Sequence, residues 1–239
     1  MLSVKLRRYD PEGSGYSLVD FDIEAGTGDS VLGLLAYIKG SIDESFAYTA
    51  FCTNEHCGEC GVMLNGVPVL ACRETVKSED LLIEPLKGFP PVRDLVVDLA
   101  PVIEKIWTAL PDISAFTDHQ EAPGCNETFA TDDGLKLFMA GRCICCGLCM
   151  SVCHIHKLDE EEVSGPMFFM ALAQYMMRAK SGGKLAELSE IAGRHSLSKC
   201  TLCGRCAKVC PQKIEISSVI SIMNQMFQDN GLFFDEEKE

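Results

Sequence analysis

Fourteen cysteines stand out in this chain of 239 residues, and twelve of them fall into three regularly spaced groups. Clustered cysteines of this kind serve either a disulfide framework or metal and iron–sulfur ligation. The N-terminus shows no charged leader followed by an apolar core and a cleavage site, so we expect a chain that is not exported. In a reducing compartment, metal ligation becomes the favoured use of the cysteines.

The first group has the spacing C-x4-C-x2-C with a fourth cysteine eleven residues later, which is the plant-type pattern for a [2Fe–2S] cluster. Its members are Cys52, Cys57, Cys60 and Cys72. Gly58 and Gly61 would let the backbone approach the cluster and donate N–H bonds to its sulfur atoms. A zinc site is the alternative, although zinc motifs seldom contain the four-residue loop.

Two further groups repeat the spacing C-x2-C-x2-C-x3-C, the bacterial ferredoxin run in which the fourth cysteine ligates the other cluster. This rule predicts one [4Fe–4S] cluster on Cys143, Cys146, Cys149 and Cys210. It predicts a second on Cys153, Cys200, Cys203 and Cys206. Because each cluster joins distant parts of the chain, we expect loss of the clusters to unfold this region.

Four residues near the motifs fall outside the ligand spacing. Cys125 and Cys145 are interpreted as structural or incidental thiols, with a redox role for Cys125 as the weaker alternative. Rieske-type ligation requires histidines in place of cysteines, and no cysteine is missing here. For His154 and His156, a hydrogen bond to a cluster sulfur or to a nearby quinone stays open.

The elements that position these ligands change in character near residue 105. Before it, a helix is expected after Asp29, ending near Gly40, and another after Asp98, ending near Leu110. The dipeptide Asn65-Gly66 predicts a hairpin turn within residues 61–70. Short β-favouring runs predict strands at 3–9, 17–23, 61–70 and 81–86.

Beyond residue 105 the pattern is that of helices separated by cysteine clusters. Pro166 suits the first position of a helix. The helices are expected at 135–140, 166–180, 184–192 and 214–228. We therefore predict two domains, residues 1–105 and residues 106–239.

The formal charge of −14 argues against nucleic acid and against anionic lipid as partners. The longest apolar stretch, from Pro166 to Met177, is too short to cross a bilayer. Docking onto a membrane-embedded partner remains compatible with this composition.

In the order of its motifs, the chain resembles the iron–sulfur subunit of succinate dehydrogenase and fumarate reductase. The likeness covers roughly residues 1–225. Beyond the cysteines, Val92–Asp98 resembles the segment between the family's two domains, and Ser164-Gly165-Pro166 resembles the start of the helix between the two cysteine motifs. The resemblance implies an α+β fold: an N-terminal β-grasp plant-type [2Fe–2S] ferredoxin domain, then an all-α two-cluster ferredoxin domain.

The resemblance also implies partners. A flavoprotein subunit would carry FAD and the dicarboxylate site, and electrons would pass through three clusters to a membrane anchor or a cysteine-rich subunit. The chain itself would hold no catalytic residue and would work in a hetero-oligomer, peripheral to the cytoplasmic side of the inner membrane. The alternatives are the same wire in an acyl-CoA or enoate reductase complex, or a free-standing ferredoxin or regulatory iron–sulfur protein.

The sequence departs from the family at two places. The family's third cluster is usually [3Fe–4S], because the position of Cys203 is normally not a cysteine, so we predict [4Fe–4S] here, with [3Fe–4S] less favoured. The family's proline and tryptophans near the quinone are replaced by residues 154–157, and the only tryptophan is Trp107. This favours atypical members whose partners are cysteine-rich subunits and which use thiols or low-potential quinols.

Overall fold

The computed structural model describes residues 1–13, 15–24, 29–76, 80–112, 131–157, 165–178 and 182–232. The chain divides into two compact units, residues 1–99 with 144–152, and residues 100–143 with 153–239. The domain boundary near residue 105 stays a prediction. The division adds one feature that the spacing of the motifs did not indicate, because residues 144–152, inside the first bacterial motif, belong with the N-terminal unit.

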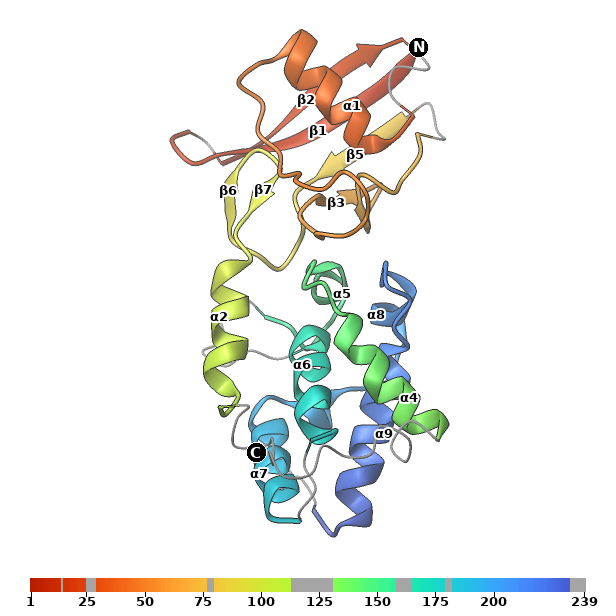
Figure 1. The fold of residues 1–239 in the computed structure, drawn as a ribbon. Coiled ribbons are helices and arrows are strands. Elements are labelled where there is room, and N and C mark those ends of the chain that lie inside the picture. Colours follow the sequence, from red (N-terminus) through yellow and green to blue (C-terminus); the bar gives the residue numbers. More distant parts are fainter. Residues whose placement is uncertain are drawn as a thin grey trace. The chain divides into compact units, whose positions relative to one another are not determined.

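The first unit is built on a five-stranded mixed sheet with the order β2-β1-β5-β3-β4 (Figure 1). β1 pairs antiparallel with β2 and parallel with β5. The turn between β3 and β4 has positive φ at Asn65 and Gly66, as a two-residue hairpin turn requires. The predicted strands are confirmed as β1 (Leu2–Asp10), β2 (Gly15–Ile23), β3 (Gly61–Leu64), β4 (Val67–Leu70) and β5 (Asp80–Glu84).

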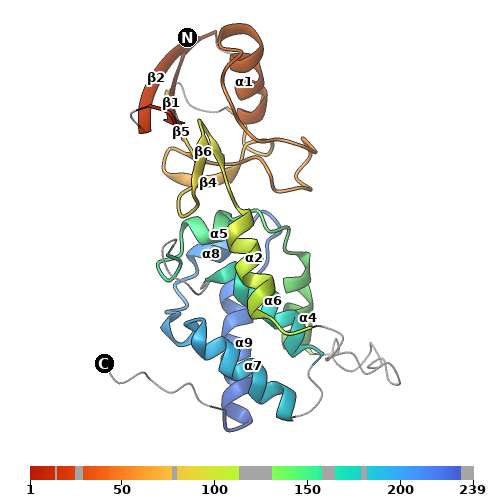
Figure 2. The ribbon, with the colours of Figure 1, turned by 90° about the vertical axis from the view of Figure 1, so that its left-hand side faces the viewer.

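One helix, α1 (Val31–Tyr37), lies beside the sheet in Figures 1 and 2 and fills the core of this unit. Its residues Leu34 and Leu35 are fully buried, as are alternate residues of β1, which is the period expected of a half-buried strand. The predicted cap was wrong by one residue. Ser30, not Asp29, accepts the N–H of Gly33 at 3.1 Å, because Ser30 is the residue directly before the first helical turn. A short π-helical turn, η1 (Ile38–Ile42), follows α1.

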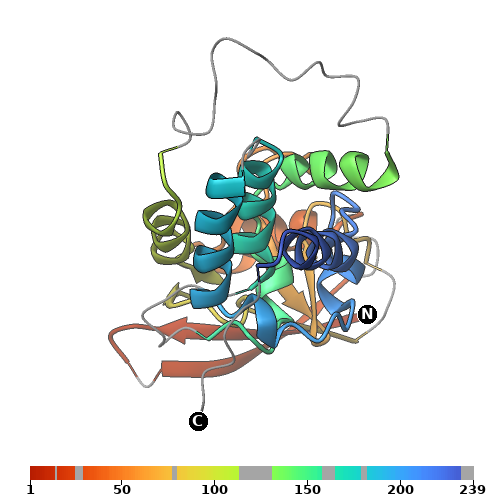
Figure 3. The same ribbon diagram turned by 90° about the horizontal axis from the view of Figure 1, so that it is seen from below.

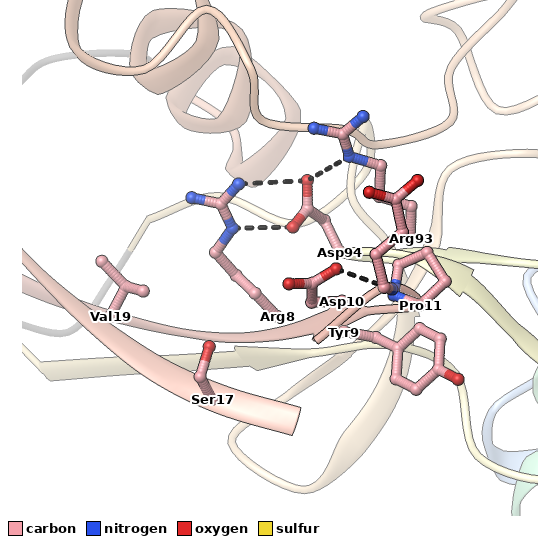
Figure 4. Close-up of a pocket in the computed structure, with 9 residues that line it drawn as sticks. Arg8, Tyr9, Asp10, Pro11, Ser17, Val19, Arg93 and Asp94 are labelled. Atoms are coloured by element: carbon pink, nitrogen blue, oxygen red, sulfur yellow. Dashed lines mark hydrogen bonds and ion pairs between the residues drawn. The ribbon is translucent and has the colours of Figure 1, made fainter. Parts of the chain in front are cut away.

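Near residue 99 the first unit contains a small hairpin of β6 (Pro91–Arg93) and β7 (Val96–Val97). The sequence pattern did not predict this hairpin. Between its strands Asp94 is buried and accepts two hydrogen bonds from Arg8, at 2.7 and 3.2 Å (Figure 4). The same carboxylate accepts the N–H of Ala47 at 2.7 Å. Asp94 thus joins β1, the loop after η1 and the hairpin in one ion-pair network.

Arg8 completes this network by donating to Asp43 at 2.5 Å and by lying 5.5 Å from the ring centroid of Phe46. Its hydrogen bonds to Asp94 raise the pKa of Arg8 further, so the guanidinium stays charged. The network lines one side of a hollow of about 440 Å³ (Figure 4). The lining residues are Arg8, Tyr9, Asp10, Pro11, Glu12, Ser17, Val19, Arg93 and Asp94.

Replacing Asp94 by alanine is expected to destabilise the first unit by roughly 2–4 kcal/mol, because the half-buried Arg8 loses its bidentate partner and Ala47 loses an acceptor. Urea unfolding of the intact chain, followed by the visible circular dichroism of its [2Fe–2S] centre, measures the change. Asp22→Ala, at an exposed position of β2, is the control and should shift stability by less than about 0.5 kcal/mol. Equal midpoints for the two variants would refute a structural role for the network.

The second unit is helical, and its helices pack around α6 (Pro166–Met176) (Figures 2 and 3). Nine of the eleven residues of α6 are buried, as expected for a helix that is covered on all sides. It contacts α4 (Asp132–Met139), α7 (Gly182–Arg194) and α9 (Ile216–Asp229). These helices confirm the predictions, including Pro166 in the first turn. Within the described residues, no helix is long and apolar enough to cross a membrane.

Three further α-helices and two 3-10 turns, η3 (Ala140–Arg142) and η4 (Leu197–Lys199), complete the helices of the described residues. α2 (Ala100–Ala109) begins the second unit and confirms the helix predicted after Asp98. α5 (Leu148–Ser151) and α8 (Arg205–Lys208) each have four residues and lie inside the two bacterial motifs. Both were missed, because a single turn between cysteines carries too few residues to show a hydrophobic period.

Candidate iron–sulfur ligand sites

The loop that carries the first cysteines is shaped around the sulfur of Cys52. Backbone N–H groups of Asn54, His56 and Cys57 donate to this sulfur at 3.4, 3.3 and 3.2 Å. Left-handed backbone at Thr53 and Glu55 turns those N–H groups inward. Led by the bonds from Asn54 and Cys57, they lower the pKa of the Cys52 thiol to about 6, so the sulfur is prepared to act as a thiolate ligand.

The hairpin of β3 and β4 returns the fourth cysteine to the others. Cys60 is buried directly before β3, and its carbonyl accepts the N–H of Ala71, the residue before Cys72, at 2.9 Å. Burial raises the pKa of the Cys60 thiol to about 12. The backbone N–H of Cys72 opposes this rise, whereas the thiol of Cys72 and the charge of Cys57 add to it. The structure thus brings the thiols of Cys52, Cys57, Cys60 and Cys72 together.

The cysteine loop of the first unit touches the first bacterial motif. A Cβ placed on Gly58 would lie 2.8 Å from Cys146 Cβ and 3.1 Å from the carbonyl oxygen of Ile144. Gly58 also has a φ of +78°, so both space and backbone require glycine here. Sequence reasoning assigned Gly58 only to the cluster loop, and its contact with Cys146 is a tertiary feature.

The first bacterial motif is anchored on the first unit by two more contacts. A Cβ on Gly147 would lie 2.7 Å from the ring of Phe89, and the hydroxyl of Ser151 donates to the carbonyl of Lys87 at 2.8 Å. Cys146 and Cys149 are buried in this segment. Their predicted partners, Cys143 and Cys210, belong to the second unit, and the grouping of these four thiols stays a prediction.

Within the second unit, the thiols predicted for the third cluster lie near one another. Cys206 interacts electrostatically with Cys153, Cys200 and Cys203, and its burial raises its thiol pKa to about 11. Burial likewise raises the pKa of Cys200. Iron held by these thiols, one buried and one half-buried, would displace their protons, so loading would become more favourable as pH rises.

Cys203, the cysteine that departs from the family pattern, has different surroundings. It is exposed, and its thiol pKa is lowered, first by the N–H of Arg205 and further by the side chains of Arg205 and Thr201. A thiolate at this corner is thus supported by a neighbouring positive charge and by hydrogen bonds. Sequence reasoning missed Arg205 and Thr201, and the only signal for them was their position beside the extra cysteine.

The two bacterial motifs have the same local backbone. Cys145 and Leu202 occupy equivalent positions with φ of +53° and +52°, and Gly147 and Gly204 follow with φ of +76° and +72°. Each turn leads into one of the four-residue helices, α5 or α8. Cys145 therefore matches a leucine that cannot be a ligand, in agreement with its position off the ligand spacing. Cys125 lies outside the described residues.

The remaining candidates near the motifs are the two histidines. His154 is exposed and His156 is half-buried, and their hydrogen bonds to a cluster or a quinone stay a prediction. All thirteen cysteines in the described part of the chain are free thiols. No set of three or more His, Cys, Asp or Glu side chains within the described ranges is spaced for a single metal ion; thiols around a cluster of several irons stand farther apart than those around one ion.

Comparison with known proteins agrees with both halves of this arrangement. A family described as "2Fe-2S iron-sulfur cluster binding domain" matches residues 3–104, and one described as "4Fe-4S dicluster domain" matches residues 139–214. These matches support a [2Fe–2S] site in the first part and [4Fe–4S] binding in the second.

Relatives match over nearly the whole chain. It is 31% identical to the fumarate reductase iron-sulfur subunit of Haemophilus influenzae, over 92% of this chain and 91% of that protein. It is 29% identical to the 8-methylmenaquinol:fumarate reductase iron-sulfur subunit of Wolinella succinogenes, over 91% and 69%. A chain of the solved Mycobacterium smegmatis Sdh1 complex in the apo form is 26% identical, with a TM-score of 0.79 and coverage of 99% and 98%. By its motifs, its fold and these relatives, the chain belongs to the family of fumarate reductase and succinate dehydrogenase iron–sulfur subunits.

Proposed function

We propose that this chain is the electron-transfer subunit of a fumarate reductase or succinate dehydrogenase-type complex. It would connect a flavoprotein subunit that carries FAD to a quinone or a thiol-dependent electron carrier. The observation that carries the proposal is the gathering of thiols in each unit of a member of this family. The first unit gathers Cys52, Cys57, Cys60 and Cys72, and the second gathers Cys153, Cys200, Cys203 and Cys206.

The ligands we propose are those of the spacing rule. Cys52, Cys57, Cys60 and Cys72 would hold a [2Fe–2S] cluster, and two [4Fe–4S] clusters would be held as predicted above. When bound, such clusters accept and release single electrons. The chain's own residues supply thiolates, backbone N–H bonds to sulfur and exclusion of water, which together set the cluster potentials.

The contact between Gly58 and Cys146 supports a short path between the first two sites. A Cβ placed on Gly58 of the plant-type loop would lie 2.8 Å from the Cβ of Cys146, a proposed ligand of the second cluster. Bulk added at Gly58 would force the two loops apart. Gly58 is thus a positioning residue in the proposed electron path, since it sets how closely the loop approaches Cys146.

The partner flavoprotein, the membrane anchor or cysteine-rich subunit, and the cytoplasmic side of the membrane all belong to this proposal. Family membership supports a hetero-oligomeric complex. The same wire in an acyl-CoA or enoate reductase is not favoured, because the named relatives described above are fumarate reductase subunits and a succinate dehydrogenase complex.

Fumarate-dependent oxidation of reduced methyl viologen by the complex, purified natively through this chain, tests the function. We expect turnover that depends on fumarate and on an intact flavoprotein partner. A flavin-containing complex with intact clusters but no turnover with fumarate or succinate would contradict the proposed reaction. Enoate and acyl-CoA substrates would then be assayed with the same preparation.

A further inference from the structure

The two bacterial motifs share a backbone but differ in what covers them. In the first, Leu148 and Met150 are buried, at 2% and 1% exposure, and Gly147 lies against Phe89. This face of the first motif is therefore packed against other residues of the first unit. The equivalent face of the third group has no such cover within the described structure, because no described atom lies within 4 Å of a Cβ placed on Gly204.

Two positions of the motif become charged and exposed in the third group. Arg205 stands where the first motif has the buried Leu148, and Lys208 stands where it has the half-buried Ser151. Leu202, at the left-handed position next to Cys203, is 42% exposed. Lys199 and Lys213 are also exposed on either side of this turn. An exposed apolar residue thus lies next to the exposed thiol of the proposed third cluster, with exposed cations close to it in the sequence.

Charge is segregated in the sequence as well. Residues 194–213 contain five lysines and arginines and no aspartate or glutamate, while the rest of the chain has 16 basic and 35 acidic residues. The loop of the first cluster shows the opposite sign, since residues 49–60 contain Glu55 and Glu59 and no lysine or arginine. The two ends of the proposed wire therefore carry opposite local charge.

We propose that the basic face, defined as Leu202 with Lys199, Arg205, Lys208 and Lys213, docks an acidic redox protein that exchanges electrons with the third cluster. The proposal rests on the proposed function and names the chemistry of the second partner. One electron passes between the partner's redox centre and the cluster, so one is oxidised as the other is reduced. No bond forms or breaks, and no proton is transferred.

A protein fits this face better than an anionic bilayer does. When the two bacterial motifs are compared, the equivalent face of the first motif is covered by protein. A bilayer would also extend its negative charge well beyond the small basic face, and the rest of the chain carries a large excess of acidic residues that such a surface repels. An acidic patch of matching size avoids that repulsion and steers the encounter.

The test measures reduction of the clusters by a photoreduced acidic flavodoxin in a stopped-flow instrument, using this chain in complex with its flavoprotein but without the second partner. The double variant Lys199→Glu with Lys208→Glu reverses two of the four charges of the basic face and leaves Arg205, beside Cys203, unchanged. Lys5→Glu with Lys87→Glu, at exposed positions of the first unit, changes the net charge equally. Leu202→Asn removes the apolar side chain and keeps a residue that tolerates positive φ.

At about 20 mM salt, we expect the Lys199/Lys208 variant to be reduced at least ~10-fold more slowly than the natural protein, with the difference shrinking near 300 mM. The Lys5/Lys87 variant should stay within about twofold. Leu202→Asn should slow reduction at both salt concentrations, because its effect is not electrostatic. Equal losses in both charge variants, or no loss in either, would overturn the proposal.

Two further readouts separate the remaining outcomes. Sedimentation with phosphatidylglycerol vesicles that requires Lys199 and Lys208, together with unchanged reduction by flavodoxin, would identify a membrane surface and overturn the protein partner. Viologen-dependent fumarate turnover should be unchanged in every variant. Absence of that turnover in the natural complex would contradict the proposed function alone, because the flavodoxin measurement detects the clusters directly.

Discussion

Replacing Cys203 by alanine is expected to convert the third cluster from four irons to three. The oxidised variant should then show the intense, nearly isotropic electron paramagnetic resonance signal of a three-iron cluster at low temperature, in stoichiometric amount. The oxidised natural protein should lack this signal, since an oxidised [4Fe–4S] cluster has no unpaired spin. The reduction potential of the site should rise, because the three-iron cluster of the usual family members replaces the four-iron one.

The physical reason lies in how unequally the four thiols are held. Cys206 is buried and Cys200 is half-buried, so they retain three-iron ligation together with Cys153. Cys203 is exposed, and hydrogen bonds from Arg205 and Thr201 lower the pKa of its thiol. The iron at that corner is the one that a missing ligand leaves open to solvent.

Cys145→Ala is the matched control, because Cys145 is also exposed but occupies the position equivalent to Leu202. It should leave the oxidised protein without the three-iron signal. A stoichiometric three-iron signal in the natural protein, purified without oxygen, would show that Cys203 is not a ligand. An unchanged spectrum in the Cys203 variant would lead to the same conclusion.

Removal of the iron is expected to abolish most of the helical far-ultraviolet circular dichroism of the second unit. Cys153 precedes α6, while Cys200, Cys203 and Cys206 follow α7, so the proposed third cluster connects both ends of this helical pair. Burial raises the pKa of the Cys206 thiol to about 11, so without iron this thiol is protonated and makes no comparable link. Metal binding of this kind is coupled to folding.

The alternative is that the helical core stays folded without iron, because its residues Phe168, Phe169 and Phe227 are fully buried. Chelation under mild oxidation, followed by circular dichroism and then by reconstitution with iron and sulfide, decides between the two. Recovery of the spectrum on reconstitution confirms reversible coupling. A spectrum that stays helical after complete loss of iron would show that the aromatic core suffices.

The ligand groups and most elements could be predicted from the sequence because they depend on short-range rules. Cysteine spacing within a loop is set by the size of the cluster, and strand and helix periods repeat every two or 3.6 residues. Asn65-Gly66 predicts its hairpin for the same reason, since the left-handed backbone of that turn selects those residues locally. Even the off-ligand position of Cys145 follows from counting along the motif.

Only the tertiary structure decided which distant segments meet. Nothing near Gly58 indicates that Cys146 lies against it, and nothing near Arg8 indicates that Asp94, 86 residues later, accepts its hydrogen bonds. The structure also decided that the first bacterial motif packs on the N-terminal unit, whereas α8 presents Arg205 and Lys208 at an exposed surface. Such pairings depend on how whole surfaces fit together and on which polar groups find partners, and no local period or spacing records either.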